Sequence, residues 1–159
     1  MPKILFVCLG NICRSPAAAG ILADLIKDHP ADKDFVIDSC AIGDWHIGEK
    51  VDSRMQAAAL SRGVVLPGRA KLFMSSYFDD FDYIFAVDQS VLHELHHLAK
   101  TPQHKAKVHL FTAFSLGYHN QDVPDPYYGG DSGFELVLDI IEDACEGFLQ
   151  HLSSKKEDF

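Results

Sequence analysis

The stretch KILFVCLGNICRSP, residues 3–16, decides the fold. Its first half, Lys3 to Cys8, is a short run of branched and aromatic apolar residues, which is typical of a strand buried in a parallel sheet. Ser15 and Pro16 follow, and these residue types favour a helix cap and a first helical turn. From Ala17 to Lys27 the apolar residues recur with a helical period. The stretch therefore predicts a strand, a tight loop and a helix in succession.

Strand and helix patterns alternate along the rest of the chain. Further strands are predicted at Phe35 to Ala41, Asp82 to Val87 and Lys107 to Phe111, and further helices at Asp52 to Arg62, Ser75 to Asp80, Asp88 to Lys100 and Asp131 to Leu152. The segment Thr112 to Gly130 is predicted as a long loop. This alternation predicts an α/β fold, a three-layer sandwich with a central four-stranded parallel sheet. Ligands bind such sheets beyond the carboxyl ends of the strands, where the loop that starts at Cys8 lies.

Length and composition indicate a single domain. The chain has 159 residues, of which 47% are hydrophobic and 23% charged, ordinary values for a globular protein. We expect one domain over residues 1–152 and a short charged tail over residues 153–159. No apolar run reaches the roughly 18 residues needed to span a bilayer, and the N-terminal apolar run is too short for a signal peptide. We therefore expect a cytoplasmic protein without a membrane partner, and the net charge of -9 disfavours a nucleic-acid partner.

The cysteine and histidine patterns do not predict a metal site. The four cysteines are Cys8, Cys13, Cys40 and Cys145. Their spacing lacks a zinc pattern, and a domain of this size needs no disulfide. Cys40 and Cys145 are predicted to be core residues. Three histidines, His93, His96 and His97, share one face of a predicted helix, which we interpret as a solvated face. No metal and no organic cofactor are expected.

Residues 8–15, CLGNICRS, form a C-x5-R-S loop between the first predicted strand and helix. A loop of this size can turn successive backbone N–H groups inward, and the following helix adds the positive end of its dipole. Gly10 is expected to supply backbone conformations that are closed to other residues. Asn11 suits a left-handed turn. Such a cradle fits a dianion such as phosphate.

Three side chains of this loop predict phosphoryl chemistry. Arg14 can hold two phosphate oxygens at once and complement the charge that develops on them during transfer. Cys8 lies at the centre of the cradle, where nearby donors and cations favour the nucleophilic thiolate. Ser15 is placed to donate a hydrogen bond to that sulfur and assist its departure. The loop has neither the glycines and lysine of a nucleotide P-loop nor the dinucleotide fingerprint.

Residues 7–16, VCLGNICRSP, resemble the signature of the low-molecular-weight protein tyrosine phosphatases, and residues 125–129, DPYYG, resemble that family's second motif. The resemblance covers Lys3 to Leu152. It implies a flavodoxin-like fold and hydrolysis of phosphotyrosine through a cysteinyl-phosphate intermediate. The implied partners are a phosphotyrosine protein as substrate and inorganic phosphate as product, and the family's members are usually monomers.

The resemblance also assigns roles to individual residues. Cys8 is the nucleophile, Arg14 the phosphate clamp, and Asp125 the general acid and then base. The residues expected to bind the substrate are Leu9, Gly10, Asn11, Ile12, Cys13, Ser15, Trp45, Tyr127 and Tyr128. Asn11, Ser39 and Asp88 match positions that brace the loop by hydrogen bonds. Cys13 is also a candidate for a reversible disulfide with Cys8 under oxidation.

Several of these residues have simpler interpretations. Asp125 alone would be a turn residue between two prolines, and Trp45 alone a partly buried core residue. Ser39 and Asp88, each expected to follow a strand, would alone be caps without contact to the loop. The segment Gly68 to Lys71 departs from the His-x-Ala-Arg stretch of many family members, which leaves its bracing network open.

Three alternative functions were compared with the sequence. An arsenate reductase would need resolving cysteines, and the chain has none between Ala41 and Ala144. A phosphoarginine phosphatase of similar sequence has threonine at the position of Ile12, so isoleucine favours phosphotyrosine. A non-catalytic phosphate-binding module would lack Cys8 or Asp125, and this chain has both.

Overall fold

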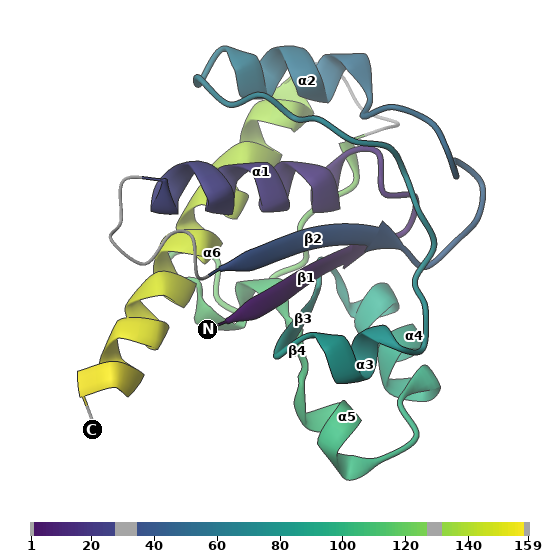
Figure 1. The fold of residues 1–159 in the computed structure, drawn as a ribbon. Helices are drawn as coiled ribbons and strands as arrows, with labels where there is room; N and C mark the ends of the chain where they lie inside the picture. The colour runs from purple at the N-terminus through teal and green to yellow at the C-terminus, as the bar shows by residue number, and fades with distance from the viewer. Residues whose placement is uncertain (1, 28–34, 127–131, 158–159) are drawn as a thin grey trace.

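Four parallel strands form the centre of the fold (Figure 1). The computed structural model describes residues 2–27, 35–126 and 132–157. The strands are β1 (Lys3–Cys8), β2 (Val36–Ala41), β3 (Tyr83–Ala86) and β4 (Val108–Leu110). They lie in the order β2-β1-β3-β4 and every neighbouring pair is parallel. The predicted α/β fold with a four-stranded parallel sheet is confirmed.

Helices cover both faces of this sheet (Figure 1). On one side lie α1 (Arg14–Ile26), α2 (Ser53–Leu60) and α6 (Ser132–Glu157), and on the other α3 (Tyr77–Asp80), α4 (Gln89–Leu98) and α5 (Pro102–Ala106). Because side chains alternate along a strand, Ile4, Phe6 and Cys8 join the core under α1 and α6, whereas Leu5 and Val7 join the core under α3 and α4. The side chain of Cys8 therefore emerges on the α1 side of the sheet, at the carboxyl end of its central strand.

Aromatic side chains in the core hold β1, the strand that leads into the loop. Phe6, Phe85 and Phe111 are fully buried, and the rings of Phe6 and Phe111 meet edge to face with their centroids 5.0 Å apart. Burial of each such side chain contributes roughly 1.5–3 kcal/mol. Cys8 ends this strand, so the position of its backbone is set by the packed core.

The start of α1 differs from the prediction. The helix begins at Arg14, two residues before the predicted first turn at Pro16, and its N-cap position is Cys13, which makes no side-chain capping bond. The prediction that Ser15 caps the helix is therefore wrong. Its hydroxyl lies within hydrogen-bond distance of the sulfur of Cys8, the contact that was also predicted for this residue.

Other element ends also shift. The short helix α5 was not predicted; it begins with Pro102, and the hydroxyl of Thr101 accepts a hydrogen bond from the amide of His104 at 3.1 Å. A 3-10 turn, η2 (Phe111–Phe114), occupies part of the predicted loop. Helix α6 continues to Glu157, five residues past the predicted end at Leu152, because residues 153–157 contain no glycine or proline.

Candidate active site

The loop from Cys8 to Arg14 closes around the sulfur of Cys8. The Cys8 side chain is buried, and its Sγ accepts a hydrogen bond from the backbone amide of Asn11 at 3.1 Å. Ser15 Oγ lies 2.9 Å from the same sulfur. The backbone of Asn11 is left-handed, with φ of 59°, as its residue type predicted. This turn aims the Asn11 amide back toward the sulfur.

The side chain of Asn11 ties the loop to three other segments. Its Nδ2 donates to Ser15 Oγ at 2.7 Å and to Ser39 Oγ at 2.9 Å, and its Oδ1 accepts from the backbone amide of Lys71 at 3.0 Å. Ser39 lies inside β2, so the expectation that it follows a strand is wrong. A capping role for Ser39 without loop contact is also wrong.

The segment from Gly68 to Lys71 has a defined place in this network although its sequence departs from the family pattern. Lys71 reaches Asn11 through its main chain, so the contact does not depend on the side chain at that position. The Lys71 ammonium group pairs with Asp38; burial opposes its charge, but the hydrogen bond to Asp38 raises its pKa above the usual value. The pair holds this segment against β2.

Gly10 is needed for space rather than for an unusual backbone. Its φ is not in the left-handed region, so that part of the prediction is wrong. A Cβ atom at this position would lie 2.8 Å from Cδ2 of His46. The imidazole of His46 therefore packs directly against the loop.

Arg14 is buried, and two elements outside its own helix hold it. Its Nη1 donates to Asp88 Oδ2 at 2.6 Å and to the backbone oxygen of Val123 at 2.9 Å. Asp88 is also the N-cap of α4, where its Oδ1 accepts from the amide of Val91 at 2.8 Å. Asp88 thus caps a helix and contacts the loop residue Arg14, so the two expected roles are combined in one carboxylate.

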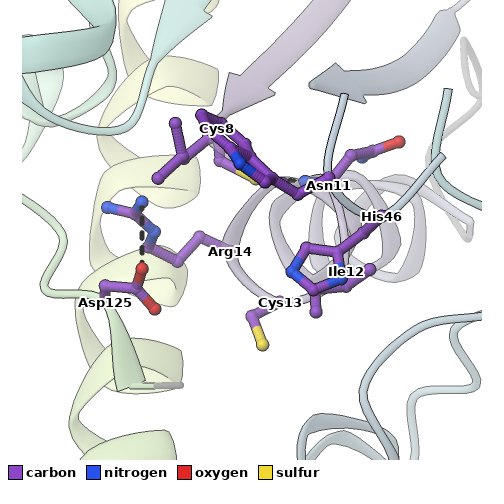
Figure 2. Close-up of a pocket in the computed structure, with 10 residues that line it drawn as sticks. Cys8, Asn11, Ile12, Cys13, Arg14, His46 and Asp125 are labelled. Atoms are coloured by element: carbon purple, nitrogen blue, oxygen red, sulfur yellow. Dashed lines mark hydrogen bonds and ion pairs between the residues drawn. The ribbon is translucent and has the colours of Figure 1, made fainter. Parts of the chain in front are cut away.

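Asp125 lies beside Arg14, across the loop from His46 (Figure 2). Its Oδ2 lies 3.8 Å from Nη2 of Arg14, and the carboxylate is about one-third exposed. The segment before it is held by the Val123 amide, which donates to the backbone oxygen of Val87 at 2.9 Å, and by Asp122 Oδ1, which accepts from the Gln89 amide at 2.9 Å. The chain therefore places a carboxylate next to the buried guanidinium.

These groups surround one cavity of about 500 Å³. Its lining residues are Cys8, Leu9, Gly10, Asn11, Ile12, Cys13, Arg14, Trp45, His46 and Asp125. Trp45 is 68% exposed at the mouth of the cavity, so its interpretation as a core residue is wrong. Tyr127 and Tyr128, predicted to form the facing wall, lie outside the described residues. The cavity has apolar walls and a buried guanidinium beside the sulfur.

His46 is a lining residue that the sequence did not single out. Its Nδ1 lies 2.8 Å from Oε2 of Glu49, three residues further along the same loop. Figure 2 shows the imidazole over the loop near Ile12 and Asn11. The only signal in the sequence was its position next to Trp45.

The other three cysteines are buried thiols. Burial, followed by the charges of Asp52 and Cys8, raises the pKa of the Cys13 thiol to about 12. Cys40 and Cys145 are fully buried core residues, as predicted, and burial raises the pKa of both thiols. Cys13, Cys40 and Cys145 are therefore neutral thiols at physiological pH.

Neither a metal site nor a membrane span is found in the described ranges. No group of three or more potential metal ligands occurs among those residues. None of their helices has the length and apolar character to cross a bilayer. His93, His96 and His97 are exposed on α4.

Comparison with known proteins agrees with this geometry. The sequence profile described as low molecular weight phosphotyrosine protein phosphatase matches residues 3–158. A low molecular weight protein-tyrosine-phosphatase of Streptomyces coelicolor is 37% identical over 157 residues, covering 98% of this chain and 96% of the relative. Two solved structures extend the comparison to the fold.

A protein tyrosine phosphatase from Entamoeba histolytica, solved with Hepes in its active site, superimposes with a TM-score of 0.93 at 41% identity, covering 98% of this chain and 99% of that one. A Drosophila arginine phosphatase superimposes with a TM-score of 0.88 at 35% identity, covering 94% and 97%. The chain belongs to the low molecular weight phosphotyrosine protein phosphatase family. It is a phosphomonoester hydrolase that acts on phosphoproteins and releases phosphate.

Proposed function

We propose that the protein removes phosphate from phosphotyrosine in proteins by two successive displacements at phosphorus. In the first, Cys8 Sγ attacks phosphorus, the bond to the phenolic oxygen breaks, and Asp125 gives that oxygen a proton. In the second, Asp125 takes a proton from water, the water oxygen attacks phosphorus, and the bond to sulfur breaks. The products are tyrosine and inorganic phosphate, and the enzyme is restored.

One observation carries this proposal: the Cys8 sulfur, the Arg14 guanidinium and the Asp125 carboxylate line the same cavity. Arg14 and the loop amides supply the positive charge that phosphoryl transfer requires, in a buried setting where each donor stabilises charge more than it would in water. Ser15 is 2.9 Å from the sulfur and holds a hydroxyl that can stabilise it as a leaving group.

The shape of the cavity supports an aromatic phosphate ester. Trp45, Leu9 and Ile12 supply apolar walls above the loop, and a phenyl ring would stack against them. A phosphoserine is too short to reach these walls while its phosphate occupies the cradle. Ile12 gives the position an apolar side chain, in place of the threonine associated with phosphoarginine. These features support phosphotyrosine as the substrate class.

Asp88, Asn11 and Ser39 are assigned to positioning rather than to chemistry. Asp88 orients Arg14, while Asn11 and Ser39 fix the loop around the sulfur. The monomeric state and the cytoplasmic location stay predictions, which sedimentation and cell fractionation test directly.

The test is release of phosphate from para-nitrophenyl phosphate and from a phosphotyrosine peptide, both in EDTA. The parent should be active on both, and Cys8→Ser should be inactive on both. Asp125→Ala should lose roughly 10²–10⁴-fold on the peptide, and much less on the nitrophenyl ester, whose leaving group needs no proton. Gln121→Ala, an exposed residue four positions from Asp125, is the matched control and should resemble the parent.

Two outcomes would overturn the proposal. If the parent is inactive on both esters but hydrolyses phosphoarginine, or reduces arsenate with a thiol donor, the substrate class is wrong. If Asp125→Ala loses the same factor on both esters, Asp125 is not the proton donor.

A further inference from the structure

A second cavity adjoins the catalytic one along the first turns of α4. Its volume is about 440 Å³, and it shares Leu9, Arg14, Trp45 and Asp125 with the catalytic cavity. Beyond these shared residues it is lined by Ile42, Gly43, Asp88, Ser90, Val91 and Glu94. We name this second cavity the flanking groove. With a phosphotyrosine in the catalytic cavity, the next residue of the substrate chain would lie over it.

The two ends of the flanking groove differ in chemistry. Where it meets the catalytic cavity, the exposed side chains of Trp45 and Leu9 present apolar surface beside the charged groups of Arg14 and Asp125. At the other end, Ser90 and Glu94 are exposed and lie one turn apart on α4, so they share a face of that helix. A ligand that fits both ends needs an apolar stem and a polar or charged tip.

The charge of the flanking groove is negative. Asp88, Glu94 and Asp125 line it, against the single guanidinium of Arg14. Asp88 is engaged by Arg14 and by the Val91 amide, whereas Glu94 is exposed at the open end. The net charge of -9 adds to the attraction for a cation and opposes an anionic substrate at long range. A positively charged residue beside the phosphotyrosine would offset that repulsion.

We infer that the flanking groove binds an arginine or lysine side chain next to the phosphotyrosine, and that Glu94 determines this specificity. The inference rests on the proposed function, since it concerns the same substrate. The alkyl stem would lie along Leu9 and Trp45, and a guanidinium would gain a further attraction over the indole ring. The terminal N–H groups would donate to the carboxylate of Glu94.

The test compares phosphotyrosine peptides of one sequence that carry Arg, Ala or Glu immediately before or immediately after the phosphotyrosine. For the parent, kcat/KM should be roughly three- to tenfold higher with Arg than with Ala at one of the two positions, the scale of an exposed ion pair with a stacking contribution. Glu94→Gln should bring this ratio close to one. Glu94→Lys should reverse the order, so that the Glu peptide is preferred over the Arg peptide.

Glu146→Gln is the matched control, because it removes the same charge from an exposed position on α6 that lines neither cavity. Its ratio of kcat/KM between the Arg and Ala peptides should equal that of the parent. In the parent, high salt should reduce this ratio. Ratios near one for the parent at both positions, or an unchanged ratio in Glu94→Gln, would overturn the inference. Failure of the parent to release phosphate from any of the peptides would instead overturn the proposed function.

Discussion

The loop that holds the nucleophile and the loop that carries the acid meet in one cavity but are held by different means. Residues 8–14 are mostly buried, and Asn11 alone makes three side-chain bonds to separate segments. Before Asp125, the amide of Val123 and the carboxylate of Asp122 bond to Val87 and Gln89, and the acid itself lies 3.8 Å from Arg14 and is about one-third exposed. A phosphate cradle must keep one shape, whereas a proton donor must reach different atoms in the two steps. Apart from the acid Asp125 itself, the exposed loop should therefore tolerate substitution far better than the buried one.

Apart from substitutions of the nucleophile and the acid themselves, replacing the phosphate clamp Arg14 should have the largest effect. Arg14→Lys keeps the charge but loses the fork that reaches Asp88, the Val123 carbonyl and two phosphate oxygens together. We expect kcat on a phosphotyrosine peptide to fall by about 10²–10³-fold, the scale of one lost transition-state donor. Arg69→Lys, an exposed arginine that donates to the backbone oxygen of Gly48, is the control and should keep parental kcat. A kcat for Arg14→Lys within tenfold of the parent would contradict the assignment of Arg14.

Replacing Asn11, whose side chain bonds the loop to neighbouring segments, should have the next largest effect. Asn11→Ala deletes three hydrogen bonds and leaves a left-handed backbone without the residue type that suits it. The free energy of unfolding should fall by about 3 kcal/mol and kcat by roughly 10–100-fold, because buried partners lose their bonds. Urea unfolding and steady-state kinetics measure the two effects.

Asn120 offers a closely matched control for that experiment. It also has a left-handed backbone, with φ of 60°, but it is exposed. Asn120→Ala therefore tests the backbone contribution without the buried bonds, and should cost less than about 1 kcal/mol. Equal losses for the two variants would show that the Asn11 bonds do not matter.

Weakening the segment that carries Asp125 should have the smallest effect on kcat, and the size of this effect should depend on the leaving group. Asp122→Ala removes the acceptor of the Gln89 amide, a single bond of about 0.5–1.5 kcal/mol. We expect kcat to fall three- to tenfold on phosphotyrosine and less than twofold on para-nitrophenyl phosphate. Asp122→Asn keeps an acceptor oxygen and should restore most of the loss, and Gln121→Ala should have no effect. The same loss on both esters would point to a general structural defect instead.

The sequence predicted those parts of the protein that depend on nearby residues. The apolar run from Lys3 to Cys8 predicts β1, and the residue type of Asn11 predicts its left-handed turn, because strand burial and turn preference are local properties. The α/β fold followed from the alternation of such patterns. The two motifs also placed Cys8, Arg14 and Asp125 in one candidate site before any contact was known.

What the sequence could not predict depends on distant contacts. The contact of the Ser15 hydroxyl with the Cys8 sulfur was predicted, but the bond that this hydroxyl accepts from Asn11 was not, because side-chain pairing within the folded loop has no local signal. The backbone amide of Lys71 donates to Asn11. Because any residue type can make this bond, the sequence does not predict it. Gly10 was expected to allow an unusual backbone conformation, but it instead leaves space for the His46 side chain. The two residues are 36 positions apart, and no local sequence pattern predicts their contact.

The bracing of Asn11 has a consequence for the order in which the molecule assembles. Its partners Ser39 and Lys71 lie 28 and 60 positions along the chain, and Asp88 is 74 positions from Arg14. Contacts of such long sequence separation form late, because chain closure must precede them. Residues 7–16 therefore acquire their shape only when β2, β3 and the segment around Lys71 are in place. Catalytic activity in this protein therefore requires that β1, β2 and β3 have assembled, and the motif alone does not provide it.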